Sequence, residues 1–465
     1  MVLGGNSTVF DFLAILCALL TKEEERLYAI KWMTADEKHL QKIIYTYRNL
    51  LAVILNASVE EYRLDNKSIS YLNEELERLQ NGKDNNKEHI FRLAVEVEKR
   101  LDMYSAGPNR GVIYRLEPLN ANVKETQIAI YPRIMPRWNT KKSERNRERR
   151  LNANFMNYMM IRMEDAAPFE MIMHYWNDEG ILQKTEGGWK LKVGLTPVMD
   201  SAKLKSKELD LPSGYAVGVE GIDNEEEVTE RVLRVFNQMF SEEYGIIVFP
   251  EALGTEEALL KIKRRMRENP EYCTFVAAPT ICNDGRNILV VLGPGGIECL
   301  RQEKTAPAIL TTKEGKVERE DLCYGNQVHL LITKELGLMA FAICAELLDP
   351  DYYRLIVNTA LADTIICSSF SPGIAAFRDT LLKGAPANLL ELYINTCSAR
   401  FVSRKNEIAL PIGFVQIPFS DGEEQPYEVE RKCHGQCAQE VCYFDIAIMY
   451  QNQKFHVEIV HKRCA

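Results

Sequence analysis

The sequence has little that would carry the chain into or across a membrane. Its apolar stretch nearest the N-terminus, residues 9–20, is interrupted by Asp11 and is too short to span a bilayer. No basic segment precedes this stretch and no small-residue cleavage site follows it, so we expect neither a membrane anchor nor a signal peptide. The twelve cysteines should then be reduced thiols in a cytoplasmic protein.

Several common catalytic patterns are also missing. The first half has no glycine-rich phosphate loop and no metal-ligand spacing, and the chain shows no Ser-His-Asp arrangement and no Tyr-x-Asp-Asp polymerase motif. Four cysteines near the C-terminus could hold zinc, but three and four residues separate the first three of them, wider than the usual two-residue knuckle. These are Cys433, Cys437, Cys442 and Cys464. Reduced structural thiols are the ordinary interpretation, and we predict no metal and no cofactor.

The sequence also has no large excess of acidic or of basic residues. The formal net charge of -9 is modest for 465 residues and argues against a chain devoted to nucleic acid. One segment departs from this balance: residues 133–150, from Arg133 to Arg150, contain eight Lys or Arg against two Glu. A solvated surface is the ordinary interpretation of such a run, and docking to a nucleic acid or an acidic protein is the alternative.

The length favours two domains. Apolar residues at helical spacing predict that residues 1–185 form a mainly helical accessory domain, opened by a capping box in which Thr8 and Asp11 precede a buried helix. Strands alternate with helices after about residue 190, and continuous apolar strands indicate sheets covered on both faces. We therefore predict an α/β domain over residues 190–465, with loops at residues 196–224 and 369–388.

Three residues with complementary chemistry each follow a predicted strand of this domain. Glu251 follows the apolar run 245–250, Lys304 follows a strand–turn–strand, and Cys344 ends the apolar run 337–343. A carboxylate, an ammonium and a thiol that meet can transfer an acyl group, because the carboxylate takes the thiol proton, the sulfur attacks, and the ammonium stabilises the oxyanion. The ordinary alternatives are a helix cap, a surface lysine and a small core residue.

The order and context of these motifs resemble the nitrilase superfamily of carbon–nitrogen hydrolases. The motifs are Phe249-Pro250-Glu251, then Gln302-Glu303-Lys304 after a Pro-Gly-Gly turn, then Ile343-Cys344-Ala345-Glu346, with Pro350 and Arg354 downstream. The resemblance implies a four-layer α-β-β-α sandwich over residues 190–465, preceded here by an additional helical domain. It also implies hydrolysis of a non-peptide C–N bond, an amide rather than a nitrile, through a thioester on the cysteine.

The resemblance further assigns roles around this triad. Glu251 would be the general base, Lys304 and the backbone N–H of Ala345 would bind the oxyanion, and Glu346 would lie at the pocket. Family members often carry a second active-site glutamate between the lysine and the cysteine. Three residues lie in that interval: Glu314, Glu318 and Glu320. Glu318 fits best, because it precedes Gly325 by seven residues.

The sequence also departs from the family pattern in ways that concern the substrate. The residue after the nucleophile is usually larger than Ala345, and residues 398–406 only loosely match the family's Arg-Ala-x-Glu-Asn helix. The resemblance implies a homo-oligomer that acts on a small-molecule amide. The alternative is an effector or scaffold subunit with weak or no amidase activity, since nitrilase-like domains also accompany other modules, including reverse transcriptases of bacterial defence systems.

Overall fold

The computed structural model divides the chain into two compact units, each described here by itself. The described residues are 1–57, 62–81, 86–102, 111–138, 151–199, 202–212, 214–311, 317–371, 374–384, 389–396, 411–418, 426–430, 441–452 and 454–464. The smaller unit comprises Met1–Pro108, Arg115–Met135 and Asn139–Ala167, and the larger comprises Asn109–Tyr114, Pro136–Trp138 and Pro168–Ala465. The division at Ala167 and Pro168 lies earlier than the sequence boundary at residues 185–190, because residues 170–176 form a strand of the larger unit.

The smaller unit is mainly helical, as its periodicity predicts. Its helices are α1 (Val9–Ala18), α2 (Lys22–Thr34), α3 (Glu37–Thr46), α4 (Arg48–Ala57), α5 (Asn66–Asn81), α6 (Asn86–Lys99) and α7 (Met163–Ala166), and β2 (Ile128–Pro132) pairs with β3 (Tyr158–Arg162). The predicted capping box is present, with Thr8 and Asp11 each bonded to the other's backbone N–H. Helix α1 is almost wholly buried and packs against α6, so it is the centre of this unit's core.

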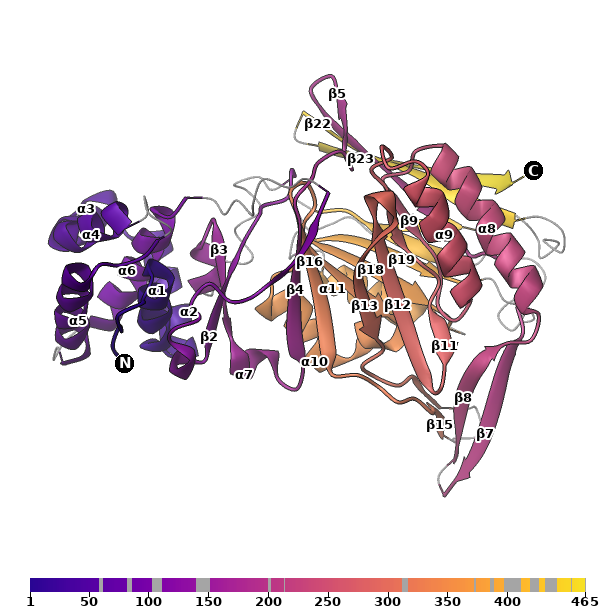
Figure 1. Ribbon diagram of the computed structural model, residues 1–465, viewed down its shortest axis with the longest axis horizontal. Coiled ribbons are helices and arrows are strands. Elements are labelled where there is room, and N and C mark those ends of the chain that lie inside the picture. The colour runs from indigo at the N-terminus through magenta and orange to yellow at the C-terminus, as the bar shows by residue number, and fades with distance from the viewer. Residues whose placement is uncertain are drawn as a thin grey trace. The chain divides into compact units, whose positions relative to one another are not determined.

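The larger unit is built on two sheets, both visible in Figure 1. The first has eight strands in the order β1 (Ile113–Leu116), β4 (Glu170–Trp176), β16 (Gln327–Thr333), β17 (Gly337–Ile343), β18 (Thr364–Ser369), β19 (Leu390–Asn395), β20 (Pro411–Gln416) and β21 (Tyr427–Glu430). The second has nine, in the order β11 (Ile281–Asn283), β12 (Arg286–Gly293), β10 (Phe275–Ala277), β9 (Ile246–Val248), β6 (Gly188–Leu195), β22 (Val441–Gln451) and β23 (Lys454–Cys464), with β13 (Ile297–Glu303) beside β12 and β5 (Gln183–Thr185) beside β6.

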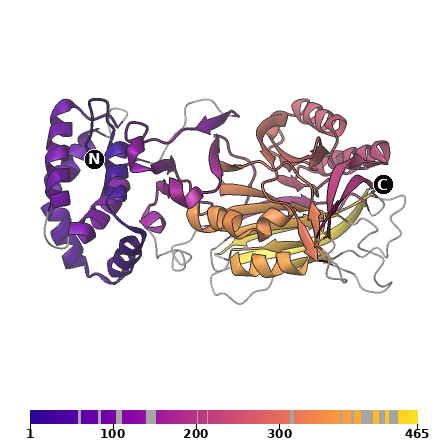
Figure 2. The same cartoon turned by 90° about the horizontal axis from the view of Figure 1, so that it is seen from below.

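The two sheets face each other across one apolar core, and helices cover their outer faces (Figure 2). Phe341 of β17 and Val248 of β9 both belong to that core, which explains why these strands read as continuous apolar runs. Helices α8 (Glu225–Ser241) and α9 (Glu256–Arg267) pack on the nine-stranded sheet. Helices α10 (Pro350–Tyr353) and α11 (Ala375–Gly384) and the π-helix η6 (Arg354–Thr359) cover the eight-stranded sheet. The predicted four-layer sandwich, preceded by a helical unit, is confirmed.

Two segments that the sequence indicated only as loops contain regular structure. Residues 196–224 include the hairpin β7 (Leu204–Leu211) and β8 (Gly214–Ile222), which joins β14 (Ile309–Thr311) and β15 (Val317–Glu320) in a separate four-stranded sheet. Strand β7 is exposed along nearly its whole length, so it carries no buried apolar face that would reveal it by alternation. Residues 369–388 include α11.

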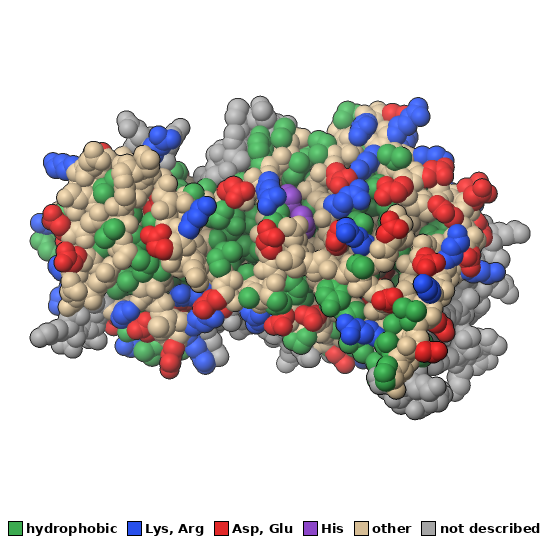
Figure 3. Space-filling model, turned by 60° about the horizontal axis from the view of Figure 1, so that its bottom comes forward, with side chains coloured by type: hydrophobic (Ala, Val, Ile, Leu, Met, Phe, Trp, Pro, Cys, Tyr) green, Lys and Arg blue, Asp and Glu red, His purple; other side chains and the backbone are tan. Residues whose placement is uncertain are grey.

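Other sequence predictions fall partly or wholly outside the described residues. These include residues 139–150 of the basic segment, Glu314, residues 398–406, Cys433 and Cys437. In the described ranges, no helix is long and apolar enough to cross a membrane and no cluster of three metal-ligating side chains occurs. On the part of the larger unit coloured in Figure 3, acidic and basic side chains are intermixed.

Candidate active site

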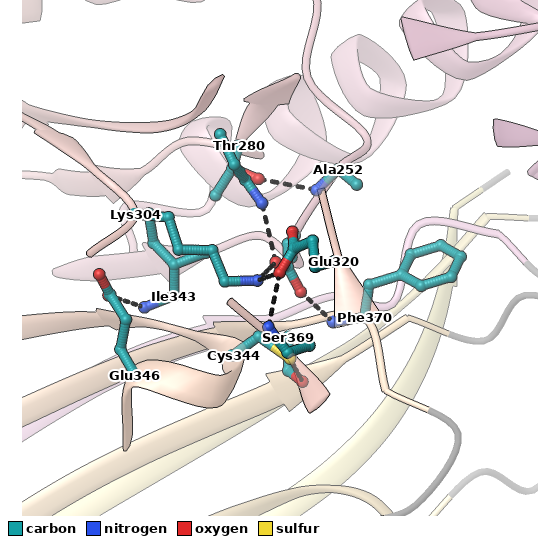
Figure 4. A network of polar contacts seen from close by, with 12 residues as sticks. Ala252, Thr280, Lys304, Glu320, Ile343, Cys344, Glu346, Ser369 and Phe370 are labelled. Atoms are coloured by element: carbon teal, nitrogen blue, oxygen red, sulfur yellow. Dashed lines mark hydrogen bonds and ion pairs between the residues drawn. The ribbon is translucent and has the colours of Figure 1, made fainter. Parts of the chain in front are cut away.

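Glu251, Lys304 and Cys344 come together in one buried cluster, and Figure 4 labels Lys304, Cys344 and several of their neighbours. Lys304 Nζ donates to Glu251 Oε1 at 2.7 Å, and the Cys344 thiol lies close enough to this carboxylate for its charge to raise the pKa of the thiol. All three residues are at most 4 % exposed. A carboxylate, an ammonium and a thiol that are separated by about fifty and forty positions in the sequence therefore form one cluster.

The strand order explains this convergence. Glu251 follows β9, and Cys344 follows β17, which runs parallel to its neighbour β18. Lys304 directly follows β13 and is anchored by its backbone N–H, which donates to the Asn287 carbonyl at 2.8 Å. Each functional side chain thus begins where a buried strand ends, so the rigid sheets fix its position.

The backbone at Cys344 has a left-handed conformation, with φ of 50°. A side chain other than glycine reaches this region only at an energetic cost of about 1 kcal/mol or more, and such strain is concentrated at functional sites. The residue begins a 3₁₀ turn, η5 (Cys344–Leu348), directly after β17. This sharp turn at the end of the strand places the sulfur beside Glu251 and Ser369.

Burial dominates the electrostatics of the cluster. Burial raises the pKa of Cys344 to about 12, the charge of Glu251 adds to that rise, and Lys304 together with a hydrogen bond from Ser369 opposes it. Burial also raises the pKa of Glu251, while Lys304 lowers it. Burial alone would lower the pKa of Lys304, but the carboxylates of Glu251 and Glu320 outweigh burial and raise it well above its usual value. The resting site therefore contains a neutral thiol beside a charged lysine.

Of the two described candidates for a second glutamate, Glu320 contacts Lys304, whereas Glu318, the candidate that the sequence favoured, has another partner. Glu320 Oε2 accepts hydrogen bonds from Lys304 Nζ at 2.7 Å and from the Ala308 N–H at 2.9 Å. Glu318 instead accepts the hydroxyl of Tyr215 at 2.8 Å. Both glutamates lie on the same face of β15, because side chains two residues apart share a face, but Glu318 is about 7 Å farther along the strand. Their distance from Lys304 depends on the register of β14 and β15.

Glu346 is fully buried and acts on the backbone rather than lining an open pocket. Its carboxylate accepts the N–H of Ile343 at 2.6 Å and the N–H and hydroxyl of Thr305 at 2.5 and 2.8 Å. Burial raises its pKa to about 7, although these hydrogen bonds oppose the rise. Because Thr305 follows Lys304 and Ile343 precedes Cys344, Glu346 joins the two segments that carry the lysine and the cysteine. Ala345 follows Cys344 in the η5 turn and is only partly buried.

Three further polar groups lie at the site that the sequence did not indicate. Asn287 Nδ2 donates to Glu251 Oε1 at 2.8 Å, the Phe370 N–H donates to Glu251 Oε2 at 2.8 Å, and Ser369 Oγ donates to Cys344 Sγ at 3.2 Å. Asn287 and Ser369 lie within or at the ends of apolar strands, and a polar residue at such a position could have indicated a site residue. Phe370 contributes through its backbone N–H, which every residue except proline has, so its residue type could not have indicated this role.

Comparison with known proteins adds similarities of fold at low sequence identity. No protein-family model and no curated protein sequence matches the chain. Among solved structures, a glutamine-dependent NAD+ synthetase from Acinetobacter baumannii is similar over 59 % of this chain, with 14 % identity and a TM-score of 0.38, and the chain spans about half of that protein (48 %).

Two other solved structures are similar to the chain. An amidase from Nesterenkonia sp. AN1, solved with acrylamide added at its active-site cysteine, is similar over 52 % of this chain and 89 % of its own, with 10 % identity and a TM-score of 0.34. The C. elegans NitFhit protein is similar over 46 % of this chain and 52 % of its own, with 11 % identity and a TM-score of 0.30.

Proposed function

We propose that this protein is a carbon–nitrogen hydrolase that cleaves a non-peptide amide through a thioester on Cys344. The observation that carries this proposal is the buried ion pair of Glu251 and Lys304 beside Cys344, at a turn where the cysteine adopts a left-handed backbone. A structural ion pair accounts for the carboxylate and the ammonium, but it does not account for a cysteine with a strained backbone beside the same carboxylate.

The first half-reaction needs only groups present in the cluster. Glu251 takes the proton of the Cys344 thiol while the sulfur attacks the amide carbon, so that a C–S bond forms and the carbonyl oxygen becomes an oxyanion. Collapse of this intermediate breaks the C–N bond, and the amine leaves with the proton that Glu251 held. In the second half-reaction water gives a proton to Glu251 and attacks the thioester, and the acid product leaves as Cys344 regains its proton.

Lys304 has one hydrogen-bond donor available for the oxyanion. Its ammonium has three N–H groups, of which two donate to Glu251 and Glu320. No acceptor for the third lies among the residues that the structure describes. A donor that is already oriented in a buried site stabilises a developing oxyanion by about 3 kcal/mol, because it needs no reorganisation at the moment of reaction. The N–H of Ala345 would be the second donor.

The test is the reactivity of each cysteine with dilute iodoacetamide at neutral pH, mapped by peptide mass spectrometry and followed by a panel of small amides. Cys344 should react faster than the other cysteines, and Glu251→Gln should slow it, because the base is lost. Cys344→Ala should abolish amide hydrolysis and leave the thermal unfolding temperature nearly unchanged.

Cys367→Ala is the matched control, because that thiol is also buried and lies close to Cys344. It should keep the alkylation rate of Cys344 and the hydrolytic rate. A Cys344 that reacts no faster than Cys367, or amide turnover that survives Cys344→Ala, would contradict the proposal.

A further inference from the structure

Residues at the carboxyl end of β18 contact both the proposed base, Glu251, and the proposed nucleophile, Cys344. The Ser369 carbonyl accepts the Glu251 N–H at 3.4 Å, and the next N–H, that of Phe370, donates to Glu251 Oε2 at 2.8 Å. The Ser369 hydroxyl contacts Cys344 Sγ at 3.2 Å. Two consecutive residues therefore contact both partners of the expected proton transfer.

The register of the sheet explains why this serine faces the sulfur. Strands β17 and β18 run parallel with Ile343 beside Ser368, so Cys344 and Ser369 follow as the next neighbours. Side chains alternate along a strand, and Ser368 Oγ accordingly points the other way and donates to the Phe249 carbonyl at 2.7 Å. Ser368 and Ser369 are both fully buried, but only Ser369 touches the sulfur.

The Ser369 hydroxyl is the donor of this hydrogen bond, and the Cys344 sulfur accepts it. The negative charge of Glu251 acts on the same thiol, and a carboxylate is a group that can take the thiol proton. When the thiol proton moves to Glu251, the sulfur becomes an anion in a site from which water is excluded, and a donor already in place replaces the lost hydration.

We infer that Ser369 is a further catalytic residue, whose hydroxyl stabilises the Cys344 thiolate during its formation and attack. This inference rests on the proposed function, in which Cys344 is the nucleophile. The Phe370 N–H donates to Glu251, so the Ser369 hydroxyl is the donor that contacts the sulfur and that mutation can remove. A hydrogen bond to an ionised group is worth roughly a 10- to 100-fold change in thiolate population.

The experiment measures the rate of Cys344 alkylation by iodoacetamide as a function of pH in four proteins: wild type, Ser369→Ala, Ser369→Thr and Ser368→Ala. For Ser369→Ala we expect the rate to fall at least about 10-fold at every pH below the pKa of the thiol, because a raised pKa lowers the thiolate fraction by the same factor throughout that range. Ser369→Thr keeps the hydroxyl and should restore most of the wild-type profile. Ser368→Ala removes a hydroxyl that is equally buried and should leave the profile where it is.

The outcomes separate this inference from the proposed function. An activated wild-type Cys344 whose pH profile is unchanged in Ser369→Ala would overturn the role of Ser369 and leave the proposed function standing. A loss of rate in Ser369→Ala that threonine does not restore would also overturn it, because that pattern indicates disturbed packing and not the loss of a hydroxyl. A wild-type Cys344 no more reactive than the other buried cysteines would refute the proposed function itself. Thermal unfolding of each variant verifies that the fold is retained.

Discussion

The two glutamates of β15 allow a sharp test of how Lys304 is held in place. Glu320→Gln removes a charge that bonds Lys304 at 2.7 Å, and the side chain of that lysine is 1 % exposed. Glu318→Gln is the matched control, because it removes the same charge two residues away, where the partner is the neutral hydroxyl of Tyr215.

The magnitudes follow from these contacts. A hydrogen bond to a charged group contributes about 1.5–3 kcal/mol, and breaking a buried ion pair outright costs about 3–5 kcal/mol. Lys304 keeps its second partner, Glu251, and a glutamine at position 320 can still accept the Ala308 N–H. We therefore expect Glu320→Gln to lower the free energy of unfolding by about 2–3 kcal/mol and Glu318→Gln by less than about 1 kcal/mol.

Urea denaturation followed by tryptophan fluorescence suits this measurement. Three of the four tryptophans, Trp138, Trp176 and Trp189, are buried in the core between the two sheets, so the signal reports mainly on the larger unit. The difference should appear as a lower urea midpoint at an unchanged slope. Equal destabilisation by the two substitutions, or a larger effect of Glu318→Gln, would refute the assignment of Glu320 to Lys304.

Three further predictions concern buried groups of the larger unit. Glu391 is fully buried, neither of its carboxyl oxygens is bonded to a described residue, and burial raises its pKa well above the usual value. The buried carboxyl group therefore destabilises the fold increasingly as pH rises above its unfolded pKa. Glu391→Met should raise the unfolding temperature more at pH 8 than at pH 5, and a gain that is larger at pH 5 would contradict this. Cys344→Gly should be up to about 1 kcal/mol more stable in urea than Cys344→Ala, because glycine accepts the φ of 50°, and the reverse order would count against backbone strain at the nucleophile. Glu346→Gln should lower the free energy of unfolding by about 2–3 kcal/mol and slow the alkylation of Cys344, because an amide has only one accepting oxygen for the donors of Thr305 and Ile343. Alkylation at the wild-type rate would show that the segments of Thr305 and Ile343 keep their positions without the Glu346 carboxylate.

The sequence by itself predicted the covered strands and the three residues of the proposed triad, and the resemblance of its motifs to a known family implied the four-layer sandwich. Continuous apolar runs such as β9 and β17 predict strands covered on both faces, and Glu251 and Cys344 are recognisable because each directly follows such a run. The capping box of Thr8 and Asp11 was equally readable, since it depends only on residues three positions apart. Local patterns of this kind need no knowledge of distant contacts.

The tertiary structure decided what depends on the register between distant strands. The choice of Glu320 over Glu318 follows from the pairing of β14 with β15, and no residue type encodes that pairing on its own. The exposed hairpin β7–β8 also escaped prediction, because neither of its faces is consistently apolar. Ser369 reaches the sulfur, and Ser368 does not, because parallel pairing with β17 sets which face of β18 meets Cys344. A shift of register by one residue would exchange the two serines, since side chains alternate between the faces of a strand.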